Sequence, residues 1–485
     1  MMTTGSGVFA REIATSITPP ARSATSIVFA VGTAPIHRLS PEQQEKVKPG
    51  NMVLLTNLSQ AALMLGIDTT DNNQKWGLSE VAKANLMLFG NAPVIFANVF
   101  DPATHKKVIS SETVTFTNLT GKLEYTDVMG NFILSSGSNT YNEGTDYLLD
   151  KNTGEIEVIA GSSLATSIGT SAVVTASYTV AMPELVTANE CIGGYNAVTG
   201  KSTGLQLADQ VYTQFRIVYN TILCPNFSQT PSVAAVMITK TEEVSGCFGA
   251  VAICDIPAEV SLFSDVAKYK TDNNLINKNL IACWPRVVFN GQSMNLSSQV
   301  AALMGQVDLS NGGFPNEEPA NKNLQCESVV TAEGELWLDQ TQANMLENQG
   351  IVTPLNTAGG WVLWGCRTTA YPVNTDPKDA FISSRRMTQW LENTFILTHF
   401  ARVYRPMTRR LIQTILTSEQ NFMDGLVSSG IILKGEIFFN EDDNPLTDLM
   451  DGMGKFHRTV TYTLPMRQIT ILTEFDPYGL TMLFG

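Results

Sequence analysis

Several features that mark common protein functions are absent or scarce in this chain. The seven cysteines, at positions 191, 224, 247, 254, 283, 326 and 366, include no C-x-x-C pair. Their odd number and irregular spacing favour buried free thiols in a reducing compartment. The four histidines are too few and too far apart for a sequence-local metal site. We therefore expect neither a structural metal nor a cofactor.

Long apolar runs and basic clusters of the usual kind are also lacking. No run approaches the roughly 20 apolar residues needed to span a bilayer. The first 20 residues show no charged segment followed by an apolar block, so no secretion signal is predicted. The net charge is -14, which argues against a general nucleic-acid binder because phosphate contacts rest on clustered Lys and Arg. We expect no direct membrane insertion and no direct nucleic-acid binding.

What the chain does contain is a series of apolar strand patterns alternating with helical ones. At 485 residues it is too long for one ordinary core, and several domains are expected. The runs 27–35, 93–99, 250–257 and 280–285 are apolar on both faces, as strands of a buried parallel sheet are. Helical patterns follow them at 78–89, 233–241 and 298–307. The sequence predicts a doubly wound α/β core over 21–101 and 184–345.

Residues 102–183 have a different texture, rich in Thr, Ser, Val, Asn and Gly. Short alternating runs such as Ile156-Glu157-Val158 are separated by turn signals such as Asn152-Thr153-Gly154. Proline stands near both ends of the segment, at Pro102 and Pro183. We interpret it as an inserted all-β domain.

The last third is helical and then extended, and we interpret 346–466 as a C-terminal α+β domain. Helices are predicted over 381–400, 408–416 and 418–427, with Ser418 as an N-cap. Residues 467–473 alternate cleanly, and an apolar pentapeptide, 480–484, closes the chain. An apolar terminus of this kind must be buried somewhere. Residues 1–20 and 467–485 are interpreted as extended strand arms.

Two patterns invite an enzymatic interpretation. Gly200-Lys201-Ser202 suggests a phosphate-binding loop, but the glycine required five residues earlier is replaced by Tyr195. Asp209, Asp255 and Asp265 lie near predicted strand ends, where α/β folds bind ligands, but no nucleophile or histidine stands at an informative spacing. An α/β enzyme that binds a nucleotide or a phosphorylated substrate at its strand ends remains the main alternative function.

The helical region concentrates positive charge. Six arginines and a single acid, Glu392, lie between 385 and 410; the arginines are Arg385, Arg386, Arg402, Arg405, Arg409 and Arg410. Arginine without lysine favours bidentate pairing with carboxylates or phosphates. In an acidic chain the simplest partner is an acidic protein surface, although a solvated helix face remains an alternative.

The order of motifs resembles contractile bacteriophage (myovirus) tail sheath proteins. The resemblance rests on Asn348-Gln349-Gly350-Ile351, then Trp364-Gly365-Cys366-Arg367-Thr368, then the paired arginines that open a long helix. The strand ending in Gly32-Thr33-Ala34-Pro35 and the segment Gly144-Thr145-Asp146-Tyr147 are similar to the same family, and so is the loop 313–322.

The resemblance implies a structural protein, not an enzyme, that polymerises around an inner tail tube and contracts to drive it through the host envelope. The terminal arms would add strands to adjacent subunits through Val8, Phe9, Ile13, Ile469, Ile471, Leu480, Leu483 and Phe484. The arginines would face the tube. Further partners would be baseplate and tail-terminator proteins. The location would be the virion tail, assembled in the bacterial host cytoplasm, or a headless bacteriocin-like device. A static structural or tube protein is a third alternative.

Overall fold

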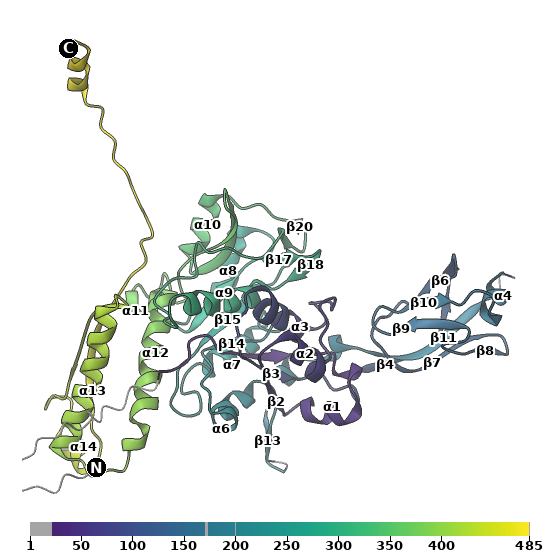
Figure 1. Cartoon of the computed structure of the whole chain (residues 1–485), viewed down its shortest axis with the longest axis horizontal. Helices are drawn as coiled ribbons and strands as arrows, with labels where there is room; N and C mark the ends of the chain where they lie inside the picture. The colour runs from purple at the N-terminus through teal and green to yellow at the C-terminus, as the bar shows by residue number, and fades with distance from the viewer. Residues whose placement is uncertain (1–21, 170–172, 199, 485) are drawn as a thin grey trace, which may run out of the picture.

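The computed structural model describes residues 22–169, 173–198 and 200–484. The molecule is elongated (Figure 1), with a β-rich arm at one end, a central sheet and a helical unit at the other end. The C-terminal segment runs away from the body (Figure 1). Among the described residues, no helix has the length and apolar character needed to cross a membrane.

An eight-stranded sheet forms the centre, in the order β2-β3-β1-β14-β15-β16-β21-β22. Its six inner strands are parallel and its two edge strands are antiparallel to their neighbours. The strands are β1 (Val28–Gly32), β2 (Met52–Leu55), β3 (Val94–Asn98), β14 (Thr221–Leu223), β15 (Val251–Asp255), β16 (Leu280–Cys283), β21 (Ile351–Thr357) and β22 (Gly360–Trp364). Most inner strands are buried at every position, as their continuous apolar runs predicted. The expectation of a large, mostly parallel sheet is confirmed.

Helices surround this sheet and share one hydrophobic core with it. They are η1 (Ile36–Arg38), α1 (Pro41–Val47), α2 (Leu58–Leu65), α3 (Gly77–Ala82), the π-helix η2 (Lys83–Leu88), η3 (Pro183–Leu185), α5 (Ala188–Ile192), η4 (Gly204–Gln210), α6 (Val211–Phe215), α7 (Pro231–Thr239), α8 (Phe263–Asp272), α9 (Leu296–Ser310) and α10 (Gln340–Glu347). A small antiparallel sheet, β18-β17-β19-β20, is made of β17 (Arg286–Phe289), β18 (Gln292–Met294), β19 (Ser328–Thr331) and β20 (Gly334–Glu335). The pair β12 (Tyr195–Asn196) and β13 (Lys201–Ser202) forms a separate hairpin.

The inserted segment folds around its own core, separate from that of the central sheet. Two four-stranded antiparallel sheets, β5-β6-β10-β9 and β4-β11-β7-β8, build it. Their strands are β4 (Lys106–Val114), β5 (Phe116–Thr117), β6 (Thr120–Lys122), β7 (Val128–Ser136), β8 (Asn139–Tyr141), β9 (Tyr147–Asp150), β10 (Glu155–Val158) and β11 (Val174–Ala181). The segment is not wholly β as predicted, because α4 (Ser163–Gly169) buries Leu164 in the same core.

The helical unit contains α11 (Pro377–Ala380), α12 (Ile382–His399), η5 (Phe400–Arg402), α13 (Arg409–Ser428), β23 (Ile432–Phe438), α14 (Leu446–Met450) and β24 (His457–Tyr462). The short helix η6 (Pro477–Phe484) lies far from it, at the end of the C-terminal segment (Figure 1). The predicted break at Ser418 is wrong, because α13 continues through it. Ile415, Glu419 and Phe422 form a buried stripe on one face of α13, so packing overrides the capping preference of serine.

The first half of α12 is buried against the central body. Trp390 donates from Nε1 to the backbone oxygen of Ser23 (2.8 Å), and Ser23 N donates to Thr394 Oγ1 (3.2 Å). The chain therefore enters the described fold along α12.

The edge strand β22 is only partly buried, unlike the inner strands of the sheet. Its outer side is covered by 321–324, with Asn321 N to Leu363 O at 2.6 Å and Leu324 N to Trp361 O at 2.9 Å. This segment removes one free edge of the large sheet.

Candidate functional site

The C-terminal segment makes very little contact with the rest of its chain. Every residue from 466 to 484 is exposed. Ile469 and Ile471 are each 85% exposed and Phe484 is 92% exposed. The other large apolar side chains exposed along it are Met466, Leu472, Phe475, Tyr478, Leu480, Met482 and Leu483. So much apolar surface on an extended segment marks a binding element for another chain.

Within the described chain, an ion pair holds the root of this segment to the body. Arg467 donates from Nε to Glu347 Oε1 at 3.1 Å, next to the end of α10. Beyond it, 467–476 has no regular structure, and Pro477–Phe484 forms a 3₁₀ helix. Within the described chain, the alternating segment 467–473 has no strand partner, so the alternation alone forms no sheet. Val8, Phe9 and Ile13 lie outside the described residues.

A two-stranded sheet beside the arm root has one open edge. β23 and β24 pair only with each other among the described strands. On the outer side of β23, Gln420 donates to Gly435 O (3.1 Å) and accepts from Ile437 N (3.3 Å). The free edge is therefore that of β24.

The register identifies the backbone groups on that edge. Gly435 lies opposite Val460 and Ile437 opposite Arg458. In an antiparallel pair, every second residue directs its backbone N–H and C=O away from the partner strand. Gly435 and Ile437 are such residues of β23, because their backbone groups bond Gln420 instead of β24. Their opposite partners, Arg458 and Val460, consequently direct their backbone N–H and C=O groups toward the free edge. A further strand could bond there.

The structure separates the six predicted arginines into two groups. Arg385 and Arg386 are buried in α12; Arg385 bonds Asn279 Oδ1 (2.7 Å), and Arg386 pairs with Asp308. Both guanidinium groups are buried and bonded within the subunit, so the prediction that these two arginines face the tube is wrong. The sequence showed their charge but not their partners, which lie 106 and 78 residues away.

The remaining four arginines, Arg402, Arg405, Arg409 and Arg410, lie on or beside the turn that joins α12 to α13. Arg405, Arg409 and Arg410 are exposed and Arg402 is half-buried. Arg402 Nη1 is buried and has no hydrogen-bond partner among the described residues. Two acids between β23 and β24 pair with side chains other than these arginines. Asp448 pairs with Lys455 (2.7 Å) and Asp443 pairs with His457 (3.4 Å).

Large apolar side chains accompany these arginines. Those exposed on the α12–α13 turn are Phe400, Val403, Tyr404 and Met407, and those exposed on α14 or just after it are Leu446, Met450 and Met453. A cavity of about 290 Å³ lies beside the turn, lined by Arg402 and Arg405 of the turn and by Gly452 and Phe456 of the segment after α14. We call this end of the helical unit the helix-pair tip. Its mixture of arginine and apolar side chains is typical of protein interfaces.

A hydrogen-bonded pair braces the tip from inside. His399 Nε2 lies 2.7 Å from Glu419 Oε1, and both side chains are buried. The pair joins the last turn of α12 to the middle of α13 and fixes the direction of the turn between them. His399 thus has a structural role in joining the two helices.

The sites considered for enzymatic chemistry are occupied by the protein itself. Asp255, at the carboxyl end of β15, accepts from Ser297 N (2.9 Å) and Ser228 Oγ (3.4 Å), and it holds the start of α9. Lys201 and Ser202 belong to the hairpin β12–β13 rather than to a loop between strand and helix. No group of three or more potential metal ligands gathers within the described ranges.

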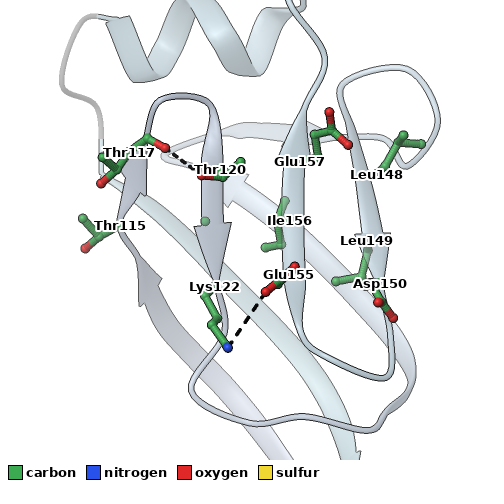
Figure 2. A pocket seen from close by; sticks show the side chains of 11 residues that line it. Thr115, Thr117, Thr120, Lys122, Leu148, Leu149, Asp150, Glu155, Ile156 and Glu157 are labelled. Atoms are coloured by element: carbon green, nitrogen blue, oxygen red, sulfur yellow. Dashed lines mark hydrogen bonds and ion pairs between the residues drawn. The ribbon is translucent and has the colours of Figure 1, made fainter. Parts of the chain in front are cut away.

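A hollow of about 710 Å³ lies on the inserted segment, over the sheet β5-β6-β10-β9. Figure 2 shows its floor, where Thr120 bonds Thr117 O at the turn and Lys122 faces Glu155 (4.0 Å). The acids Asp150, Glu155 and Glu157 are all exposed. The hollow is the open face of a small sheet, and no buried titratable group lines it.

Two of these features were not predicted from the sequence. Nothing in the local sequence indicates that the edge of β24 is open. That conclusion depends on the hydrogen bond between Gln420 and Gly435, which only the folded structure shows. The apolar part of the helix-pair tip did carry a signal, since Phe400, Val403, Tyr404 and Met407 stand between the arginines. Only the charges entered the prediction.

Comparison with known proteins agrees with the motifs. No family model matches the chain. It is 29% identical over 418 residues to the tail sheath protein of Burkholderia phage BcepMu, covering 82% of this chain and 84% of the relative. It is 26% identical over 205 residues to the major tail sheath protein of Serratia phage KSP20, covering 40% of this chain and 50% of that protein.

Solved structures show the same fold. The contracted sheath complex of the extracellular contractile injection system PVC matches with a TM-score of 0.59 at 11% identity, covering 99% of both chains. The contracted helical sheath of the anti-feeding prophage matches with a TM-score of 0.55 at 13% identity, covering 98% of this chain and 100% of the other. The chain belongs to the contractile tail sheath protein family and is a structural tail sheath subunit, not an enzyme.

Proposed function

We propose that this subunit polymerises around an inner tail tube by exchanging its terminal segments with neighbouring copies. The single observation that carries the proposal is the pairing of an exposed apolar C-terminal arm with an open strand edge in the same chain. Beyond Arg467 the arm has no strand partner among the described residues, and β24 offers backbone groups that no described segment uses. Two such halves in every copy suit a polymer of identical subunits.

The energy of such an exchange is sufficient to hold subunits together. About five backbone hydrogen bonds at roughly 0.5–1.5 kcal/mol each give several kcal/mol before side chains are counted. Burial of Ile469 and Ile471 would add to this through the hydrophobic effect. One arm added to β24 leaves a new edge, on which a second arm can pair. The segment with Val8, Phe9 and Ile13 is our candidate for the other arm.

The helix-pair tip would face the tube. Arg402, Arg405, Arg409 and Arg410 would pair with acidic side chains of the tube protein. Exposed ion pairs contribute on the order of 0–1 kcal/mol each and are screened by salt. Contacts this weak would break during contraction, while the exchanged arms keep neighbours tethered.

We also propose different roles for different segments of the chain. The doubly wound α/β body would supply the contacts that change on contraction, and the inserted segment 102–183 would lie on the outside. The hydrogen bonds of β21 and β22 to the large sheet support moving the predicted boundary at 346 to a position after β22. The arms would remain 1–20 and 467–485.

Contraction would be a shift between two packings of the α/β bodies that drives the tube through the host envelope, with no nucleotide hydrolysis. Baseplate and tail-terminator proteins would bind the ends of the polymer. Assembly would take place in the bacterial host cytoplasm, and the mature location would be a virion tail or a related injection device.

Removal of residues 469–485 tests the proposal. We expect the truncated subunit to fold, because those residues are exposed, and to remain unpolymerised. Negative-stain electron microscopy and sedimentation would measure this beside the full chain. The change Val460→Pro should have the same effect from the acceptor side, because it removes a backbone N–H at the free edge. Sheath-like tubes from either variant would contradict the exchange.

A further inference from the structure

A polar cavity of about 410 Å³ lies at the root of the C-terminal arm. One wall is the loop after α9, with Asn311, Asn316 and Glu317, and the other wall is the arm root, 463–466. β24 runs directly into this second wall. The cavity therefore lies where the open strand edge ends.

A buried carboxylate with a free oxygen closes the cavity. Glu318 is 7% exposed and lines it. Its Oε1 accepts from Ser383 N (3.0 Å) and Ser383 Oγ (2.7 Å) in the first turn of α12. Its Oε2 is buried and has no hydrogen-bond partner among the described residues. Burial raises the pKa of Glu318 to about 7. An unpaired buried carboxylate is costly, so a donor at Oε2 would be favoured.

The cavity's own polar groups do not supply that donor. Lys322 Nζ pairs with Glu317 Oε1 at 2.5 Å. Asn311 Nδ2 donates to Asn316 Oδ1. Since the described chain brings no three metal ligands together, a bound metal is not favoured either. Arg386 and Arg367 act on Glu318 through their charge, but neither is bonded to Oε2, which has no partner among the described residues. A donor to Oε2 would therefore be a side-chain cation that enters from outside the described chain.

The N-terminal segment provides a cation in the right neighbourhood. Arg22 lies over the ring of Phe314 (5.3 Å to its centroid), and the oxygen of Phe314 accepts from Asn311, a cavity residue (3.4 Å). Residues 1–21 contain a single basic side chain, Arg11. The C-terminal arm also contains one, Arg467, but Glu347 already binds it.

We propose that Arg11 of a second copy of this chain enters the cavity and pairs with Glu318 Oε2. The inference rests on the proposed arm exchange and assigns the edge of β24 to the N-terminal arm, with the C-terminal arm on the new edge beyond it. A strand added to β24 that continues past Tyr462 runs along 463–466, the cavity wall. Guanidinium suits the site because it presents several donors to a carboxylate and to nearby amide oxygens. The pair would fix the register of the exchanged arm, which backbone bonds alone leave free to slip.

Cross-linking between two differently substituted subunits tests the contact. Cys247 and Cys326 are first changed to Ser, because the first is exposed and the second half-buried. One preparation then carries Arg11→Cys and the other Met466→Cys, at an exposed position of the cavity wall. On co-assembly and mild oxidation we expect a disulfide-linked dimer of about twice 52.7 kDa.

The outcomes separate the two proposals. Polymers without the cross-link would overturn the Arg11 contact and leave arm exchange standing, whereas the absence of polymers would overturn arm exchange itself. A chain carrying both cysteines that cross-links only within itself would show that Arg11 binds its own subunit, which also overturns the inference. Eleven residues separate Arg22 from Arg11 and reach at most about 36–40 Å, so this outcome is sterically open.

A double-mutant cycle tests the charge pair. We expect Arg11→Gln and Glu318→Gln each to raise the protein concentration needed for polymerisation by about tenfold or more, and the double variant to be no worse than either single one. Arg11→Lys should recover part of the loss. Lys46→Gln, at an exposed position on α1, is the matched control. Additive effects would contradict the pair, and Arg11→Gln remains a decisive test even if Glu318→Gln disturbs the start of α12.

Discussion

Arg386 on α12 binds Asp308 near the end of α9 through two hydrogen bonds in the interior of the subunit. Nη1 lies 3.1 Å from Oδ1, and Nη2 binds Oδ2. The two side chains are 4% and 0% exposed. Nη2 also donates to the backbone oxygen of Thr25 at 3.2 Å. One guanidinium therefore joins the α/β body, the helical unit and the root of the N-terminal segment.

Asp308→Asn should destabilise the subunit strongly. The change leaves the guanidinium of Arg386 buried without its counter-charge, which costs about 3–5 kcal/mol in the free energy of unfolding. Urea denaturation followed by circular dichroism measures the loss. The matched control is Asp272→Asn, which breaks the exposed pair with Lys268 and should cost no more than about 1 kcal/mol. Equal effects of the two changes would show that the buried pair does not hold the units together.

The central sheet could be predicted because its strands are locally distinctive. Val28–Gly32 and Val251–Asp255 are apolar at nearly every position, and a short run of this kind rich in β-branched and aromatic residues is typical of a strand buried on both faces. The inserted segment was recognisable for the opposite reason. Glu155–Val158 alternates exposed and buried positions as its sequence alternates charged and apolar residues.

What could not be predicted depends on partners far away in the sequence. The run of β22 indicates a strand but not which sheet it joins. The proposal to move the boundary from 346 to a position after β22 therefore depends on the pairing of β21 and β22 in the large sheet, which the sequence does not show. The charge of Arg386 is visible in the sequence, whereas its burial depends on Asp308. The sequence of 467–473 alternates as a strand does, but the segment forms no strand in the described chain. Its exposed side chains indicate that its strand partner lies in another chain.

The subunit should become less stable as the pH rises from about 4.5 to 8, in part because of Glu80. Glu80 is fully buried, bonded by Ser298 Oγ (2.5 Å) and Asn295 Nδ2 (3.1 Å). Burial, assisted by the charge of Asp255, raises its pKa from 4.5 to about 8, against the opposing effects of the hydrogen bonds from Ser298 and Asn295 and of the charge of Arg286. The folded state thus keeps a proton that the unfolded state releases in this range, and each pH unit favours unfolding by up to about 1.4 kcal/mol.

Glu80→Gln isolates that contribution, because the amide does not titrate. Urea midpoints of both proteins at pH 5, 6, 7 and 8 should diverge, with the wild type losing more stability as the pH rises. Other buried acids such as Glu318 are present in both proteins and cancel in the difference. Parallel curves would mean that Glu80 is ionised in the folded state throughout.

Arg402, Arg405 and Arg409 changed together to Glu should permit polymerisation but prevent assembly around the tube. Each exposed pair with the tube contributes only about 0–1 kcal/mol, but three per subunit repeated along a polymer add up, and reversal turns attraction into repulsion. Electron microscopy of sheaths assembled with the tube protein would show empty polymers. The control is Lys106, Lys122 and Lys151 changed to Glu, three exposed lysines of the inserted segment, which should leave tube-filled sheaths. Tube-filled sheaths from the arginine variant would contradict this prediction. If Tyr404→Ser instead gave empty sheaths, the apolar side chains of the tip, rather than its charges, would bind the tube.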